Sequence, residues 1–338
     1  MAKTAVVILN FNGVQYLEQF LASVTQYSKE AEVIVVDNAS TDDSISFLEE
    51  NYPKLRVIQF EKNLGFTGGY NEALDQLDNE YSVLLNSDIE VTPNWIEPII
   101  DYMDKHPHVA ACQPKILDFN QKSKFEYAGA AGGFLDFMGF PYCRGRVFDT
   151  LEEDQGQYDQ IKQLDWATGA CMFVRTADFK SAGGFDTDFF AHMEEIDLCW
   201  RMRLMGKSLF CVPESKVYHV GGGTLNKLNP RKTYLNFRNN LSLLFKNENA
   251  FNLFWKLPLK WGLDMAAAFK LGLGQSWGHG WAVLRAHIDF LKLLPKNLKK
   301  RRQVHLSPST SIRNSQFLLP YQYFIKGRKT YHDLHQKS

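Results

Sequence analysis

Four short apolar runs alternate with segments of helical length in the first half of the chain, and this alternation restricts the possible fold more than any other feature. The runs are rich in β-branched residues, as in strands buried on both faces; they are TAVVILNF (4–11), AEVIVVDN (31–38), LRVIQF (55–60) and YSVLLN (81–86). Amphipathic segments at 14–27, 43–50, 69–77 and 93–105 are typical of helices. The pattern predicts an open α/β sheet whose strands are mostly parallel.

The predicted strands share a polar end. Each is followed by asparagine or aspartate; these residues are Asn10, Asp37, Asn38, Asn63, Asn86 and Asp88, and Gly65 follows Asn63. Such residues are common in ordinary surface turns. However, the carboxyl ends of parallel strands share one edge of a sheet, and ligands bind beyond that edge. We therefore expect these residues to bind one polar ligand.

The usual phosphate-binding loops are absent from this sequence. No GxGxxG follows the first predicted strand, and no GxxxxGK[ST] occurs. The segment NLGFTGGYN (63–71) is glycine-rich, but its glycines can also serve only to let the chain turn into a helix. A divalent cation is then the expected means of neutralising phosphates. Asp88 is its candidate ligand, because Mg²⁺ takes one or two carboxylates together with phosphate oxygens.

An acidic cluster begins a second amphipathic helix further along the chain. Before it, residues 125–148 are rich in glycine and aromatic residues without a clear period, which predicts a long excursion over the sheet that can act as a lid. ACMFV (170–174) then has the composition of a buried strand. In the helix, Leu198, Met202 and Met205 recur at helical spacing and predict a buried face.

The carboxylates of that helix have two interpretations. Glu194, Glu195 and Asp197 lie in its first turn, where the helix dipole favours acids, and Asp197 can pair with Arg201 on the surface. Alternatively, a carboxylate beside apolar residues keeps a raised pKa and can act as a general base. His219 ends the later run SLFCVPESKVYH; a lone histidine is more often structural, but it can also bind Mn²⁺ beside a carboxylate.

Seven ordered motifs resemble one enzyme family. VVILNFN, VIVVDNASTDDS, NLGFTGGYN, LLNSDIEV, WATGACMFVR, FDTDFFAHMEEIDLCWRMR and VYHVGGGT are similar to the inverting glycosyltransferases of family two, and most of all to the rhamnosyltransferase-like branch that builds bacterial surface polysaccharides. The resemblance covers residues 4–245. It implies a GT-A fold with a Rossmann-like mixed sheet over residues 1–245, followed by a helical extension over residues 246–338.

The resemblance also implies a role for each matching residue. Phe11 borders the nucleotide base, Asp37 and Asn38 bind base and ribose, and Trp166 and Gly169 belong to the acceptor site. NSD replaces the family's DxD motif, so Asp88 with His219 binds a divalent metal, Mg²⁺ or Mn²⁺, and Asn86 occupies the first position, where many members have aspartate. The family's catalytic aspartate falls on Glu195, a departure that leaves Glu194 and Asp197 as alternative bases.

Charge is distributed unevenly along the chain. Residues 1–215 contain 17 Lys and Arg against 34 Asp and Glu, whereas residues 216–338 contain 21 against 4. In the basic part, Trp277, Trp281, Leu284, Ile288 and Leu291 form one helical stripe. This combination predicts a helix on an anionic membrane surface; the alternative is a helix docked on the catalytic domain. No reader motif for nucleic acid is present.

Five cysteines without a CxxC pair indicate a reducing compartment, and the N-terminus lacks the layout of a secretory signal. We therefore predict a cytoplasmic enzyme, peripheral on the inner face of the cell membrane. It would transfer a sugar from a nucleoside-diphosphate donor, dTDP-rhamnose or a UDP-sugar, to a glycan or lipid-linked glycan. The alternatives are a sugar nucleotidyltransferase and a non-catalytic protein that binds nucleotide sugars.

Overall fold

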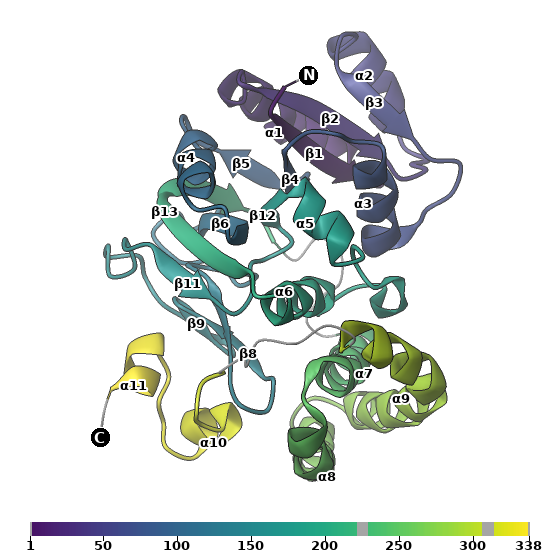
Figure 1. Cartoon of the computed structure of the whole chain (residues 1–338), viewed down its shortest axis with the longest axis vertical. Helices are drawn as coiled ribbons and strands as arrows, with labels where there is room; N and C mark the ends of the chain where they lie inside the picture. Colours follow the sequence, from purple (N-terminus) through teal and green to yellow (C-terminus); the bar gives the residue numbers. More distant parts are fainter. Residues whose placement is uncertain (1, 222–228, 306–313, 337–338) are drawn as a thin grey trace.

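A mixed sheet forms the centre of the molecule. The computed structural model describes residues 2–221, 229–305 and 314–336, and within them the sheet has nine strands in the order β11-β13-β6-β12-β4-β1-β2-β3, with β5 beside β13 (Figure 1). The strands are β1 (Thr4–Asn10), β2 (Ala31–Asp37), β3 (Arg56–Gln59), β4 (Tyr81–Asn86), β5 (Ile89–Val91), β6 (Val109–Asp118), β11 (Lys162–Leu164), β12 (Cys171–Arg175) and β13 (Ser208–His219).

Helices cover both faces of this sheet. α1 (Val14–Tyr27), α2 (Ser44–Asn51) and α4 (Glu97–Lys105) pack with Val6 and Ile8 in one core, whereas α3 (Gly65–Asp75), α5 (Thr176–Ser181) and α6 (Glu194–Leu204) pack with Ala5 and Val7 in the other. This two-sided burial explains why the strand sequences are continuously apolar. The predicted α/β fold is confirmed.

The predicted strands agree with the structure more closely than the predicted helices. The helix predicted at 69–77 begins earlier, at Gly65, whose N–H donates to Asn63 Oδ1 at 2.7 Å. The helix predicted at 93–105 begins later, at Glu97. Asn94 has a left-handed backbone (φ 58°), so the chain turns there before the helix can start.

Residues 125–148 fold into a second sheet, and the prediction of an irregular lid is wrong. β7 (Gly133–Leu135), β8 (Pro141–Cys143), β9 (Arg146–Val147) and β10 (Thr150–Leu151) pair in antiparallel order. Their glycines allow close packing rather than movement. A Cβ on Gly133 would lie 2.1 Å from the Trp166 ring, and one on Gly145, which has φ +97°, would lie 2.4 Å from Phe125.

Three long helices follow the sheet. α7 (Pro230–Asn247), α8 (Ala250–Gly274) and α9 (Trp277–Val304) pack on one another beside α6 (Figure 1). The boundary predicted at residue 245 falls in the last turn of α7, and a separate unit beyond it stays a prediction. In the part of the chain that is described, no helix has the length and apolar character needed to cross a membrane. All five cysteines are buried and unpaired.

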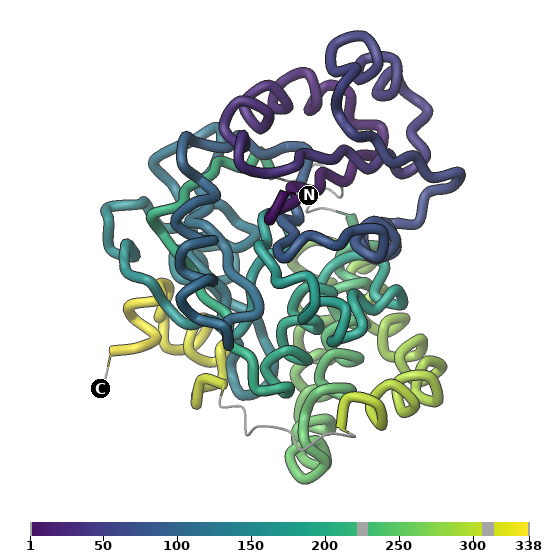
Figure 2. The backbone as a smooth tube through the Cα atoms, turned by 45° about the horizontal axis from the view of Figure 1, so that its top comes forward, coloured from purple at the N-terminus to yellow at the C-terminus, as the bar shows by residue number. Residues whose placement is uncertain are grey.

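The last segment returns to the small sheet. α10 (Leu319–Phe324) and α11 (Tyr331–His335) lie beside β8 and β9 in Figures 1 and 2, and Lys270 of α8 places its Nζ 3.5 Å from the centre of the Phe324 ring of α10. The Tyr142 hydroxyl of β8 shares hydrogen bonds with Ser315 (2.5 Å) and His335 (3.2 Å). The ring of Tyr323 packs at a tilt against that of Phe148, with 4.9 Å between the ring centres. Residues 314–336 therefore complete the core of the small sheet.

Candidate active site

The parallel strands bring the predicted nucleotide-binding residues to one edge. β1 pairs with β2 and β4 in a register that places Asn10 opposite Asp37 and Leu9 opposite Asn86. Asn10 Nδ2 donates to Asp37 Oδ1 at 3.2 Å, while the buried Oδ1 of Asn10 has no hydrogen-bond partner. The strand ends thus form one polar edge, as the sequence predicted.

The next turn along this edge is held by Asn38. Its Nδ2 donates to Asn63 Oδ1 at 3.1 Å, and its Oδ1 accepts from the Leu64 N–H at 2.8 Å. Phe11 is about half exposed beside this edge, at 49%. Gly65 faces Phe190. A Cβ atom added to Gly65 would lie 3.8 Å from a carbon of the Phe190 ring. The loop after β3 therefore contacts the segment that leads into the acidic helix.

Asp88 and His219 form a buried pair at the same edge. Asp88 Oδ1 lies 3.1 Å from His219 Nε2, because β5 and β13 pair directly next to these residues. The other ring nitrogen, Nδ1, lies 3.4 Å from Glu126 Oε1. Burial alone would raise the pKa of Asp88, but the hydrogen bond and charge of His219 lower it. Residues 222 and 223, the later glycines of the VYHVGGGT motif, lie outside the described residues.

This pair fits a divalent cation only in part. A carboxylate oxygen and an imidazole nitrogen suit Mn²⁺, and both already point toward one place. Among the described residues, however, no cluster of three or more His, Cys, Asp or Glu side chains could hold a metal. A cation at Asp88 and His219 would therefore need further oxygen ligands, such as those of a bound diphosphate.

The three acids of α6 have different environments. Asp197 is fully buried, and its carboxylate accepts from Arg201 Nε (2.9 Å), Lys246 Nζ (2.9 Å) and Asn247 Nδ2 (2.8 Å). Burial raises its pKa, but Lys246 and Arg201 lower it below the ordinary value. Asp197 does pair with Arg201 as predicted, yet the pair is buried rather than on the surface. Its carboxylate is occupied by structural contacts.

Glu194 is buried and Glu195 is half-buried, and neither has such partners. The Oε2 atoms of both have no hydrogen-bond partner in the structure. Burial raises the pKa of Glu195 to about 7, and burial together with the charge of Glu195 raises the pKa of Glu194 well above its ordinary value. At neutral pH Glu195 can therefore exchange a proton readily. The buried face predicted for α6 is confirmed for Leu198 and Met202 but not for Met205, which is 44% exposed.

Two sets of contacts connect Glu195 with Asp88. The Asn86 N–H donates to Ala170 O at 2.9 Å, and a Cβ on the adjacent Gly169 would lie 3.7 Å from Glu195 Cβ. Burial is the main cause that raises the pKa of the Cys143 thiol, and the charges of Glu126 and Glu195 raise it as well. Since Glu126 contacts His219, the acidic helix and the Asp88 turn border one region, as expected from the motifs.

The two residues predicted to bind the acceptor lie differently. Gly169 is beside Glu195, whereas Trp166 is 3% exposed and its Nε1 donates to Phe134 O at 3.0 Å. These contacts make Trp166 a packing residue, and an acceptor role for it stays a prediction. Cavities of about 300 and 590 Å³ occur around β11 and α11, and neither is lined by Asp88 or Glu195.

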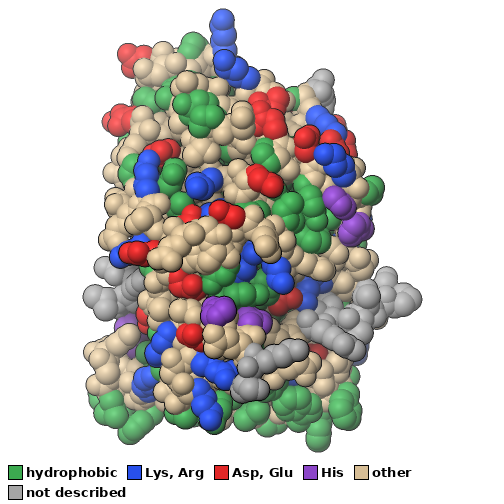
Figure 3. Space-filling view, turned by 90° about the vertical axis from the view of Figure 1, so that its left-hand side faces the viewer, with side chains coloured by type: hydrophobic (Ala, Val, Ile, Leu, Met, Phe, Trp, Pro, Cys, Tyr) green, Lys and Arg blue, Asp and Glu red, His purple; other side chains and the backbone are tan. Residues whose placement is uncertain are grey.

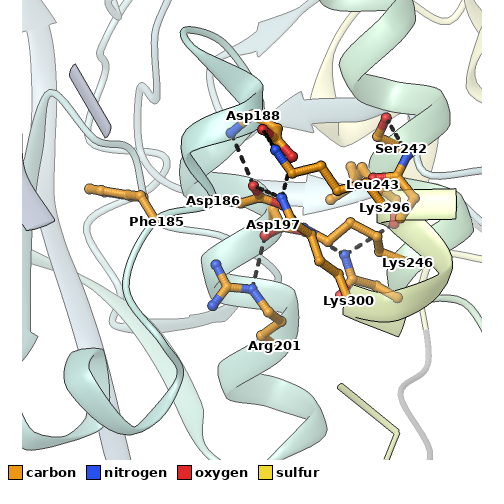
Figure 4. Close-up of polar contacts among 12 residues, drawn as sticks. Phe185, Asp186, Asp188, Asp197, Arg201, Ser242, Leu243, Lys246, Lys296 and Lys300 are labelled. Carbon is orange, nitrogen blue, oxygen red and sulfur yellow. Dashed lines mark hydrogen bonds and ion pairs between the residues drawn. The ribbon is translucent and has the colours of Figure 1, made fainter. Parts of the chain in front are cut away.

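An ion cluster fixes the loop that precedes α6. Lys246 bridges Asp186 and Asp197, and Lys300 of α9 pairs with Asp186 and Asp188 (Figure 4). Burial raises the pKa of Asp186, but Lys246 and Lys300 lower it far below the ordinary value. The basic C-terminal helices therefore hold the segment that carries Glu194 and Glu195. The alternative of a helix docked on the domain is correct for this side of α9.

Sequence reasoning missed several polar residues of this region. Glu126, Cys143 and Arg146 belong to the glycine-rich stretch that had been interpreted as a lid. No periodicity marks them, because strands of two or three residues are too short to show one. His192, whose Nε2 is buried without a partner, has φ 69°. A non-glycine residue with such a backbone conformation is often found at functional sites.

Comparison with known proteins agrees with this geometry. Residues 5–130 match the model "Glycosyl transferase family 2". The chain is 24% identical, over 78% of its length and 90% of the relative's, to the N-acetylglucosaminyl-diphospho-decaprenol L-rhamnosyltransferase of Mycobacterium tuberculosis. It is 25% identical to the rhamnosyltransferase WbbL of Escherichia coli, over 63% of this chain and 82% of WbbL.

Solved structures share the fold. TarS (residues 1–349) of S. aureus aligns with a TM-score of 0.55 at 18% identity, over 89% of this chain and 86% of TarS. A mannosyltransferase of Pyrobaculum calidifontis in complex with GDP-Man and Mn²⁺ aligns with a TM-score of 0.53 at 15% identity, over 88% and 79% of the two chains. Residues 5–130 are thus similar to glycosyltransferase family 2, and the chain shares the GT-A fold of these solved structures, as its motifs predicted.

Proposed function

We propose that the protein is a metal-dependent, inverting transferase. It moves a sugar from a nucleoside diphosphate, dTDP-rhamnose or a UDP-sugar, to a hydroxyl of a lipid-linked glycan in cell-surface polysaccharide synthesis. The observation that supports this best is Glu195, a half-buried carboxylate with a pKa near 7 that borders the same region as Asp88 and His219. The name of the mycobacterial relative, which specifies a diphospho-decaprenol sugar, supports a lipid-linked acceptor.

In the proposed mechanism the chain supplies the base and the binding groups. Glu195 accepts the proton of the acceptor hydroxyl as that oxygen attacks the anomeric carbon, so a single displacement inverts the configuration. A cation bound by Asp88 and His219 would supply positive charge for the leaving diphosphate. The Asn10, Asp37 and Asn38 side chains at the strand ends would orient the nucleoside.

Turnover of a donor panel tests this function and its two alternatives. The panel contains dTDP-rhamnose, UDP-N-acetylglucosamine and other UDP-sugars, with an N-acetylglucosaminyl-diphospho-lipid as acceptor. A transferase releases the nucleoside diphosphate and extends the acceptor. A nucleotidyltransferase would instead release pyrophosphate from a sugar phosphate and a nucleoside triphosphate, and a binding protein would release neither.

Metal binding should depend strongly on the nucleotide. Because Asp88 and His219 provide only two ligands, Mn²⁺ alone should bind weakly, and UDP or dTDP should raise its affinity by about tenfold or more. The free Mn²⁺ signal in electron paramagnetic resonance measures this coupling. Asp88→Asn should abolish it. Equal Mn²⁺ affinity with and without nucleotide would show that the metal site is complete in the protein and lies elsewhere.

We also propose that the helical end of the molecule lies on an anionic membrane. The stripe predicted on α9 faces solvent, with Trp277 59%, Trp281 69% and Ile288 55% exposed, while Val283 and Phe290 on the opposite side are buried. On α8, Phe251 and Phe254 are 84% and 86% exposed. Figure 3 shows hydrophobic side chains gathered along the lower end of the molecule, where Figure 1 places α8 and α10.

The charge of these helices selects the membrane over a second copy of the chain. Residues 250–304 contain ten Lys and Arg but only Asp264 and Asp289 as acids. Asp264 is buried against Lys260 and His287, and Asp289 pairs with Lys292. The exposed charge is therefore positive, so two copies meeting here would repel each other, whereas anionic lipid attracts them.

Liposome binding tests the membrane surface. The double variant Trp277→Ser/Trp281→Ser should lose at least about tenfold in affinity for phosphatidylglycerol vesicles, because two large apolar side chains no longer leave water. Ile161→Ser, which removes an exposed apolar side chain near β11, is the matched control and should bind normally. Equal binding by the double variant and the wild type would exclude this surface, as would equal binding to neutral phosphatidylcholine vesicles.

A further inference from the structure

Arg146 on β9 is buried, and the charge of Glu126 acts on it without forming an ion pair. It is 8% exposed, its Nη2 lies 3.4 Å from Cys143 Sγ, and its guanidinium stands 4.6 Å from the centre of the Tyr127 ring. Its Nε has no hydrogen-bond partner, and in the described part of the chain no carboxylate forms an ion pair with it. Burial of a charge without a partner is costly.

Several other buried cations of the protein have carboxylate partners, although Nη2 of the buried Arg144 also has no hydrogen-bond partner in the described part of the chain. Lys115 pairs with Asp154, Lys260 with Asp264, and Arg201 with Asp197. Arg144, two residues before Arg146, donates from Nε to Ala131 O at 2.8 Å and from Nη1 to Gln160 O at 3.1 Å. Like Arg144, Arg146 therefore lacks a carboxylate partner among the described residues, but its acceptor in the protein is a thiol rather than carbonyl oxygens.

The position of Arg146 connects it with both ends of the active site. The Cys143 thiol, which it contacts, has a pKa raised mainly by burial and also by the charges of Glu126 and Glu195. Glu126 in turn lies next to His219, the partner of Asp88. Arg146 thus borders the space between the candidate base and the candidate metal ligands, where unpartnered polar atoms of Glu195 and Glu194 also lie.

A second cation faces the same aromatic ring. Lys232 of α7 places its Nζ 5.9 Å from the centre of the Tyr127 ring, and its charge lowers the pKa of His192, although burial is the larger cause. Arg146 and Lys232 therefore approach one ring from different elements, β9 and α7. Two cations at one ring suit an anion, and the planar fork of arginine matches phosphate oxygens.

We propose that Arg146, with Lys232 beside it, binds a phosphate group of a substrate. The inference rests on the proposed function, in which both the nucleotide-sugar donor and the lipid-linked acceptor carry a diphosphate. The phosphate oxygens would accept from the Arg146 Nε–H and Nη–H groups and supply the missing ion pair. Either substrate could provide this phosphate, and the two sources are separated by experiment.

The test compares Arg146→Met, Arg146→Lys and Arg144→Met. Because Arg146 has no ion pair to lose, Arg146→Met should melt at or above the wild-type Tm, whereas Arg144→Met should melt lower and bind ligands normally. Arg146→Met should weaken phosphate binding by about 10- to 100-fold, the value of a hydrogen bond to a charged group. Arg146→Lys should recover part of this loss.

Two measurements identify the source of the phosphate. Calorimetric titration with UDP and with dTDP in the presence of Mg²⁺ measures nucleotide affinity without turnover, and a weaker affinity would show that the donor provides the phosphate. The second measurement compares, at saturating donor, the KM for an N-acetylglucosaminyl-diphospho-lipid with that for methyl N-acetylglucosaminide. A rise in KM for the diphospho-lipid alone would show that the acceptor provides the phosphate. A loss in either measurement supports the site and names its ligand.

Other results would overturn the proposal. If Arg146→Met binds nucleotides and uses both acceptors like the wild type, Arg146 binds no phosphate. If Arg146→Met melts well below the wild type and its affinities are unchanged, the residue is structural. Failure of the proposed function would look different, because the wild type would then transfer no sugar from any donor while the nucleotide titrations remained readable.

Discussion

Replacement of Glu195 by glutamine is expected to reduce kcat by about 10²- to 10⁴-fold, the usual contribution of a positioned general base. Glutamine keeps the shape of the side chain but cannot accept the proton of the acceptor hydroxyl. The fold should be unaffected, because Glu195 Oε2 has no hydrogen-bond partner to lose. Steady-state kinetics and nucleotide titration of the same preparation measure both properties.

The pH profile gives a second view of the same residue. Burial raises the pKa of Glu195 to about 7, so the active, ionised form is lost as the pH falls below that value. In the wild type, kcat/KM should therefore rise with pH and level off above about 7. Glu194→Gln should cost less than Glu195→Gln, since burial and the charge of Glu195 raise the pKa of Glu194 well above its ordinary value and so disfavour its ionised form. If Glu195→Gln kept full activity and Glu194→Gln lost it, the base would be Glu194.

Replacement of Asp197 by asparagine is expected to lower the free energy of unfolding by about 3–5 kcal/mol, as when one partner of a buried ion pair is removed. The change leaves Lys246 and Arg201 buried with less negative charge around them. Urea unfolding measures this loss. Asp289→Asn, which breaks a more exposed pair on α9, is the control and should cost less than about 1 kcal/mol.

This experiment also decides what Asp197 does. The pKa of Asp197 is lowered in the folded protein, so its contribution is present above the unfolded pKa near 3.9 and is lost as the pH falls below it. Acid should therefore reduce the difference in stability between Asp197→Asn and the wild type. A variant that unfolds like the wild type but has no activity would instead identify Asp197 as the catalytic carboxylate.

The sequence predicted those parts of the fold that depend on local pattern. β1, β2 and β4 are buried on both faces, so their apolar runs were visible, and their shared polar edge followed from parallel pairing. β6 was missed because Gln113, Pro114 and Lys115 interrupt it. Lys115 is tolerated there because Asp154 and Asp159, far along the chain, neutralise it. No local pattern can reveal such a partner.

The candidate site was predictable in outline for a similar reason. Motifs identified Asp88, His219 and the acids of α6, but they could not rank the three carboxylates. The Asp197 carboxylate is occupied by Lys246 of α7, a residue 49 positions away. The Oε2 atom of Glu195 has no such partner. Likewise, the stripe on α9 had the spacing of a core face, and only the packing of the opposite side shows that it faces solvent.

The account depends most on Glu195 and the Asp88–His219 pair bordering one region. Paramagnetic broadening tests this directly, using protein labelled with ¹³C at the glutamate carboxyl groups. The Glu195 resonance, identified by its absence from Glu195→Gln, should broaden when Mn²⁺ and UDP or dTDP are added, but not with Mg²⁺ and not in Asp88→Asn. A Glu195 resonance that stays sharp while Mn²⁺ and nucleotide are bound would contradict the proposed active site.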